Sequence, residues 1–100
     1  MDKITALTYA KKYAEEVKKN YSPLAVIVYG SYINGVPNED SDIDVAVIFN
    51  GFTGDFLETS AMLHQMTCEI NTAIEPVLLD ITNDKSGFAH EIMRVGQVVA

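Results

Sequence analysis

Two aspartates lie two residues apart at the start of an apolar segment, in Asp42-Ile-Asp44. If residues 42–49 form a strand, side chains at i and i+2 point to the same face, so the two carboxylates lie side by side, about 7 Å apart at the backbone. Adjacent carboxylates repel each other unless a proton or a cation lies between them. Carboxylate oxygens are also the ligands that Mg²⁺ prefers. The pair therefore predicts a site for a divalent cation.

The alternative is a strand that simply begins with solvated acids, because the preceding loop contains Glu39 and Asp40. The alternation of residue types argues against it. Aspartate is disfavoured inside strands, yet Asp44 lies between Ile43 and Val45. An acid placed at a cost to stability favours a functional site over a surface charge.

The same stretch does not fit two better-known motifs. Residues 30–35 have the glycine spacing of a phosphate-binding P-loop, but valine and proline follow where that loop requires lysine and serine or threonine. A calcium-binding EF-hand loop that starts at Asp40 would need glycine at its sixth position and glutamate at its twelfth. The chain has Val45 and Gly51 there.

Hydrophobic periodicity and turn residues divide the chain into alternating helices and strands. Apolar residues at spacings of three and four in the first helix predict a buried stripe of Ile4, Leu7, Ala10, Ala14 and Val17. The core candidates of the middle helix include Phe56 and Met62. This order of elements predicts a small α/β domain of two or three layers. The predicted helices cover residues 3–20, 55–71 and 88–95, and the predicted strands cover residues 24–29, 42–49 and 73–80.

Length and composition predict one domain over residues 1–100, with a single hydrophobic core. No apolar run reaches the roughly 20 residues of a membrane span, and the first residues do not resemble a signal peptide. With the single Cys68, these features predict a cytoplasmic protein. The net charge of −7 and only seven basic residues make direct nucleic-acid binding an unexpected function. They fit a metal site or a basic protein partner better.

The sequence resembles a known family at these positions. Gly30-Ser31, then Gly35, then the segment from Ser41 to Val45, is similar to the signature of the DNA polymerase β-type nucleotidyltransferase superfamily. The resemblance runs over about residues 24–95. It is strongest to the minimal nucleotidyltransferases, which occur beside HEPN-domain partners in prokaryotic toxin–antitoxin pairs. It implies the polymerase β-like fold, a small mixed β-sheet flanked by helices.

The resemblance also implies a third carboxylate on a later strand. Glu75 matches that position, and an acid between Ile74 and Val77 is unexpected in a buried strand. Pro76 indicates an edge strand, so an ordinary edge-strand charge is the alternative reading of Glu75. Asp80 is the other candidate, although its position suits a strand end and turn. Family members mostly carry aspartate at this place.

The mechanism that the resemblance implies is phosphoryl transfer with two Mg²⁺ ions and ATP as the nucleotide donor. Asp42 and Asp44 would bridge the two ions. Glu75 would hold the catalytic ion and help to deprotonate the acceptor hydroxyl. Gly30 and Ser31 would orient the phosphates of the nucleoside triphosphate.

In the HEPN-associated branch, the acceptor is a tyrosine hydroxyl of the partner protein, which receives AMP. The resemblance therefore predicts an antitoxin-type protein adenylyltransferase. A homo-oligomeric transferase with another substrate remains an alternative. So does a non-catalytic module that binds and sequesters a HEPN partner, because many relatives carry Arg or Lys after Gly-Ser, whereas Tyr32, Ile33 and Asn34 follow here.

Overall fold

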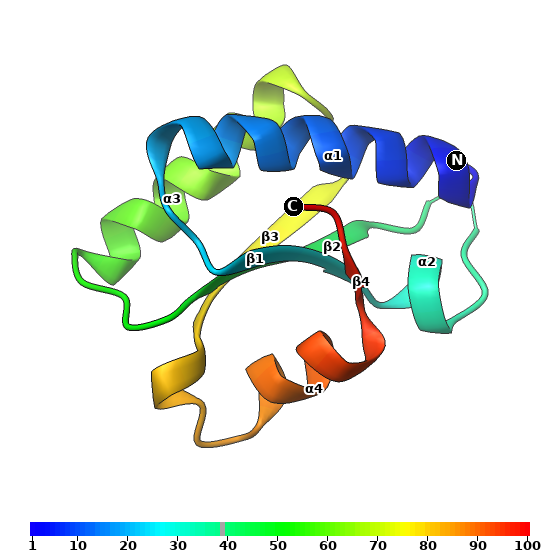
Figure 1. Cartoon of the computed structure of the whole chain (residues 1–100). Coiled ribbons are helices and arrows are strands. Elements are labelled where there is room, and N and C mark those ends of the chain that lie inside the picture. Colours follow the sequence, from blue (N-terminus) through cyan, green and yellow to red (C-terminus); the bar gives the residue numbers. More distant parts are fainter. Residues whose placement is uncertain (39) are drawn as a thin grey trace.

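The computed structural model describes residues 1–38 and 40–100, and it confirms an α/β fold built on a mixed four-stranded sheet. Glu39, which the sequence places in the acidic loop, lies outside the described residues. Helices cover both faces of the sheet, so the fold has three layers (Figure 1). In chain order the elements are α1 (Lys3–Asn20), β1 (Ala25–Tyr29), α2 (Ser31–Asn34), β2 (Ile43–Phe49), α3 (Phe56–Met66), the 3₁₀ turn η1 (Thr67–Glu69), β3 (Ile74–Asp80), the 3₁₀ turn η2 (Ile81–Asn83), α4 (Phe88–Val95) and β4 (Gln97–Val98).

The strand order is β3-β2-β1-β4. β1 pairs with β2 and with β4 in antiparallel fashion, and β2 pairs with β3 in parallel. β3 is thus an edge strand. This confirms the prediction made from Pro76, which lacks the N–H that a residue of a central strand would donate. β4 was not predicted, since two residues are too short to show a periodic pattern.

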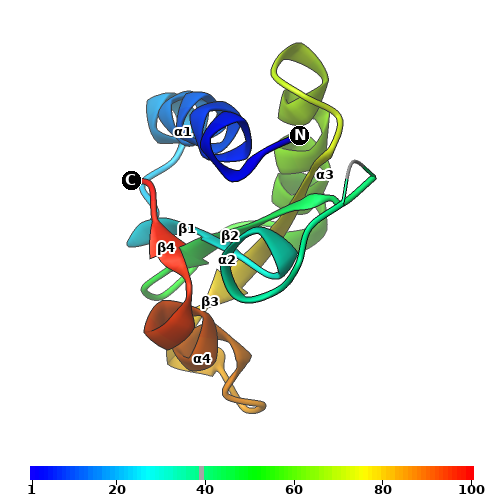
Figure 2. The ribbon, with the colours of Figure 1, turned by 90° about the vertical axis from the view of Figure 1, so that its right-hand side faces the viewer.

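Alternate residues of the strands serve two different hydrophobic clusters. Val45 and Val47 of β2 pack with α1 and α3 on one face, together with Leu63 and Tyr13 of those helices. Ala46 and Ile48 of the same strand pack on the other face against Ile92 of α4. The central strand is therefore buried on both faces, and α4 marks the second face (Figure 2).

Helix α1 begins where the sequence predicts it, because the Asp2 side chain accepts a hydrogen bond of 2.7 Å from the Thr5 N–H. Its buried stripe is rotated from the predicted one. Ile4 is 78% exposed, whereas Ala6 and Tyr13 are fully buried. The Tyr13 hydroxyl donates a hydrogen bond to the Leu63 carbonyl, so this stripe holds α1 against α3.

Helix α3 is shorter than predicted and ends in the η1 turn. The prediction that Phe56 and Met62 lie in the core is wrong. Phe56 is 53% exposed and Met62 is 43% exposed, whereas Leu63 is buried. Across the residues that the structure describes, no helix is both long and apolar enough to cross a membrane.

Candidate active site

The candidate site lies at the end of the sheet where β1 leads into α2 and where β2 and β3 begin. Tyr29 of β1 is the register partner of Asp44 of β2, and Asp44 is the register partner of Glu75 of β3. Register partners point to the same face of a sheet. The three side chains thus form a row across three strands, on the face that α4 covers further along.

Asp44 is the centre of this row, and its charged form is disfavoured by burial and by the neighbouring acids. It is only half-buried, whereas every other residue of β2 is buried. Burial raises the pKa of Asp44 above its ordinary value, and the negative charges of Asp42 and Glu75 raise it further. The two neighbours are exposed, so their charges reach Asp44 from the solvent side.

Asp42 does not lie within the strand as the sequence predicted. β2 begins at Ile43, and Asp42 precedes it in the loop. The two aspartates therefore do not form a pair on one strand face: Asp42 is the last residue of the loop, and only Asp44 lies in the strand. The two carboxylates still interact, since the negative charge of Asp42 raises the pKa of Asp44.

Gly30 forms the turn between β1 and α2, directly beside Asp44. Its backbone has a φ of +80°, a conformation that residues other than glycine rarely adopt. A Cβ atom at this position would also collide with the Oδ2 atom of Asp44. Gly30 is required both by the turn and by the close approach of the carboxylate.

Ser31 begins α2, and the Gly30 carbonyl accepts hydrogen bonds from the N–H groups of Ile33 and Asn34. These bonds close a single helical turn directly after the strand. Gly35 ends it, and a Cβ there would lie 3.0 Å from the Ser31 Cα. The Gly-Ser and Gly elements of the sequence pattern therefore form one compact turn, with Gly30 against the acidic row.

Asp80, the alternative third acid, has a structural role at the far end of β3. Its register partner is Phe49, five residues beyond Asp44 on β2. Its carboxylate accepts hydrogen bonds from the N–H groups of Gly51, Phe52 and Thr82 and from the Thr82 hydroxyl. These bonds hold the pKa of Asp80 well below its usual range.

The donor set at the site is made of carboxylate oxygens, which suits a hard cation such as Mg²⁺. Among the described residues, no three His, Cys, Asp or Glu side chains converge as closely as ligands of one metal ion do. The acids are nonetheless near enough for two of them to raise the pKa of the third, and a cation would relieve that repulsion. The residues thus fit a divalent metal by the chemistry of their oxygen donors, and not by a convergence of three side chains on one point.

Two features of the site were missed by sequence reasoning. Tyr29 was noted only as the end of a strand, although it borders Asp44. Phe88 was noted only as the start of a helix, although its ring lies 5.8 Å from the Tyr29 ring. An aromatic residue directly before Gly30 was the available signal for Tyr29, whereas Phe88 comes from a distant segment and had none.

We predict that Gly30→Ala loses more stability than Gly51→Ala. Both positions have positive φ, which costs a residue with a Cβ roughly 1–3 kcal/mol. Only at Gly30 does the added Cβ also meet a side chain, because nothing lies within 4 Å of the corresponding atom at Gly51. Urea unfolding of both variants measures the difference. Equal losses would show that the approach of Asp44 to Gly30 has no energetic weight.

We predict that Asp80→Asn lowers the melting temperature by a few degrees at neutral pH. Because the folded-state pKa of Asp80 is depressed, its stabilising effect is present above the ordinary value of about 4 and is lost as the pH falls through the depressed value. The gap to the wild-type protein should therefore narrow below about pH 4. Glu69→Gln, a change at an exposed acid of η1, is the matched control. A difference in melting temperature that stays constant with pH would show that the ionised Asp80 carboxylate does not stabilise the fold.

The chain is similar to known proteins in sequence and in fold. Residues 11–100 match the model of the family described as Polymerase beta, Nucleotidyltransferase. A protein of Methanocaldococcus jannaschii named "Putative protein adenylyltransferase" is 40% identical over 48 residues, which are 48% of this chain and 55% of that protein. The match thus spans about half the length of that curated relative.

A solved structure has the same fold. It is described as a "putative nucleotidyltransferase from Sulfolobus solfataricus" and superposes with a TM-score of 0.71, covering 96% of this chain and 80% of that one. At 23% identity, this likeness concerns the fold alone. The family match covers the whole sheet and all three acids, so the chain belongs to the polymerase β nucleotidyltransferase family.

Proposed function

We propose that this chain is a Mg²⁺-dependent nucleotidyltransferase that transfers AMP from ATP to a hydroxyl group. The observation that carries the proposal is the acidic row beside the Gly30 turn, where the charges of Asp42 and Glu75 act on half-buried Asp44. The name of the Methanocaldococcus relative supports adenylyl as the transferred group. Membership of the family supports nucleotidyl transfer in general.

In this proposal, Asp42, Asp44 and Glu75 hold the metal ions. Bound Mg²⁺ supplies neutralisation of the charge on the triphosphate and on the reacting oxygens. Glu75 is exposed on the edge strand, so an acceptor hydroxyl can reach its carboxylate and pass its proton there. The Ser31 hydroxyl and the N–H groups of the Gly30–Ser31 turn orient the phosphates.

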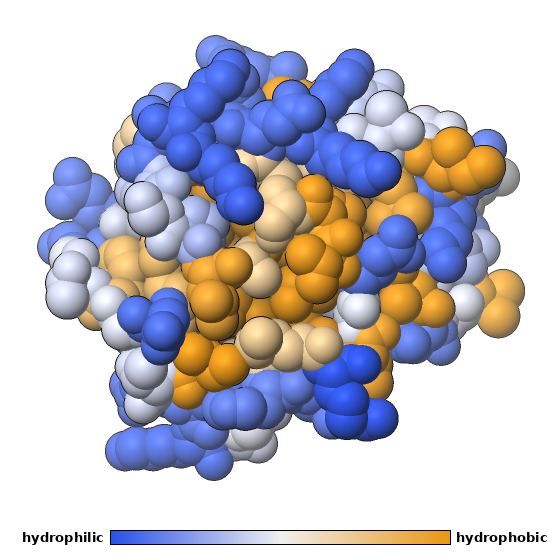
Figure 3. Space-filling model, in the orientation of Figure 1, coloured by the Kyte–Doolittle hydropathy of each residue, from blue (hydrophilic) through white to orange (hydrophobic). Residues whose placement is uncertain are grey.

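The proposed acceptor is a tyrosine of a HEPN-type protein partner, as the sequence resemblance implies. Figure 3 shows an apolar band between α1 and α4, over the β4 edge of the sheet, that could take part in docking. At this edge, Val98 of β4 is 60% exposed. A net charge of −7 favours a partner with a basic surface.

A second candidate function is a non-catalytic module that binds and sequesters such a partner. The observation in its favour is the absence of a basic residue directly after Gly30-Ser31. Elsewhere, the Arg94 guanidinium is paired with the Glu91 carboxylate of its own helix at 2.6 Å. A homo-oligomeric transferase that acts on another substrate is the third possibility and needs no HEPN partner.

We predict that Asp44→Asn changes stability in two opposite ways. Without metal at neutral pH, the variant should be slightly more stable than the wild type, by under about 1 kcal/mol, because repulsion from two acids is removed from a half-exposed group. With Mg²⁺ or Mn²⁺, only the wild type should gain stability as the metal concentration rises. Melting curves over a metal titration measure both effects, and equal metal shifts in the two proteins would contradict a shared metal site.

We predict that incubation with Mg²⁺-ATP and a HEPN-type partner adds AMP to the partner. Each AMP raises the partner's mass by about 329 Da, which intact-mass spectrometry resolves. A chelator should abolish the modification, because the phosphates cannot approach three carboxylates unneutralised. Co-purification of the two proteins should survive the chelator, since docking rests on apolar contact and charge.

Glu75→Gln and Asp80→Asn form the matched pair of variants for this experiment. Glu75→Gln should stop transfer, whereas Asp80→Asn should retain it at a temperature where the variant is folded. The reverse result would make Asp80 the third acid. A stable complex that never gains mass would favour the sequestering module, and no complex at all would favour the homo-oligomeric transferase.

A further inference from the structure

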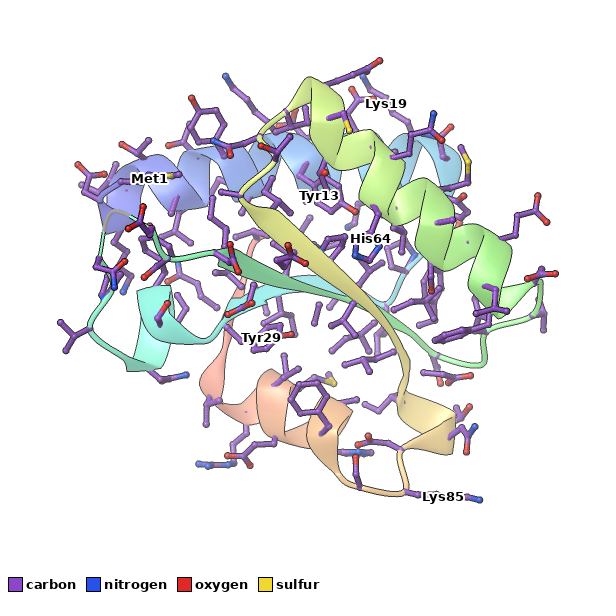
Figure 4. The ribbon with its side chains drawn as sticks, turned by 180° about the vertical axis from the view of Figure 1, so that it is seen from behind. Met1, Tyr13, Lys19, Tyr29, His64 and Lys85 are labelled. Carbon is purple, nitrogen blue, oxygen red and sulfur yellow. The ribbon has the colours of Figure 1, made fainter. Side chains whose placement is uncertain are left out.

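Two aromatic rings continue the site beyond the acids, and the proposed function does not use them. Tyr29 lies at the end of β1 between the sheet and α4 (Figure 4). Its ring meets the ring of Phe88, the first residue of α4, edge to face, with 5.8 Å between centroids and an angle of 86°. Tyr29 is the register partner of Asp44, so the ring pair borders the acidic row.

Phe88 is the outer member of this pair. It is 44% exposed, which is high for a phenylalanine that packs on another ring. An edge-to-face contact uses only one side or edge of each ring, so it leaves ring surface free for a further partner. Exposed aromatic rings are the surfaces on which proteins stack nucleotide bases.

The start of α4 is held rigidly, so Phe88 occupies a defined position. The Asp84 carboxylate accepts hydrogen bonds from the N–H groups of Ala89 and His90, each at 2.9 Å. The same carboxylate pairs with the His90 ring at 2.6 Å. Ala89 is buried, and Ile92 packs against the sheet. A platform fixed in this way loses little freedom when a ligand stacks on it.

We propose that the base of the nucleotide stacks on Phe88, with Tyr29 as the support behind it. This inference rests on the proposed function, because it places a nucleotide in the same site. The phosphates would lie at the Gly30–Ser31 turn and the acidic row. Tyr29 fills the space beside Asp44, and Phe88 lies one ring further out, so a group joined to the phosphates through a sugar reaches Phe88.

Stacking recognises the flat face of a base and not its hydrogen-bonding edge. The seat therefore favours purines through their larger ring area, and by itself it does not separate adenine from guanine. Selection for adenine, if present, comes from groups other than this ring pair.

The test compares Mg²⁺-ATP with Mg²⁺-tripolyphosphate, which has the phosphates but no base. Phe88→Ala should weaken ATP binding about tenfold, or about 1.4 kcal/mol, and leave tripolyphosphate binding unchanged. Phe88→Tyr should bind ATP as the wild type does. Met93→Ala, at a 38% exposed position of the same helix, is the control and should change neither affinity.

A second variant gives a direct signal without relying on the alanine substitution. The chain has no tryptophan, so Phe88→Trp introduces a single tryptophan at the proposed seat. Its emission should change on binding ATP and not on binding tripolyphosphate.

The outcomes separate this inference from the function on which it rests. If the wild type binds both ligands but Phe88→Ala loses affinity for both equally, or for neither, stacking is refuted while the phosphate site stands. If the tryptophan emission responds equally to the two ligands, stacking is also refuted. If the wild type binds neither ligand, the proposed function and the stacking inference both fail.

Discussion

The arrangement of this protein depends on one exception in a buried strand. β2 is central in the sheet and is covered by helices on both faces, so six of its seven residues are buried. Asp44 is the half-buried one, at the end where the strand begins. A carboxylate can be kept there only where the covering layers end, and the Gly30 turn leaves it the necessary space. The exposed acids on either side follow from the same opening.

Much of this architecture was predictable because its causes are local. The breaks at Pro23 and at the Gly30–Ser31 pair fix the ends of the first strand, and the buried run of β2 is evident from its apolar residues. The limits of α1 and of α4 were also predicted correctly. That two aspartates and a glutamate form one acidic group followed from the family resemblance, and the register of β2 and β3 brings Asp44 and Glu75 together.

The remaining features depend on contacts between distant segments, which a single sequence does not show. Ile4 matched the helical stripe but lies where nothing covers α1, so it is exposed. β4 is a strand only because two residues pair with β1. Phe88 meets Tyr29 because α4 packs on the second face of the sheet, and no spacing rule links the two residues. Asp80 resembled a ligand by residue type, but its hydrogen bonds to the N–H groups of Gly51, Phe52 and Thr82 give it a structural role.

Pro76 has a consequence for how the protein behaves among other chains. β3 is an open edge, and open edges can recruit strands from other molecules into aggregates. Pro76 follows Glu75 immediately and has no N–H to offer a foreign strand, and the charge of Glu75 adds a further deterrent. The edge beside the acids is thereby protected from backbone pairing without being covered. A strand from another molecule is kept away, while a single protruding side chain can still approach.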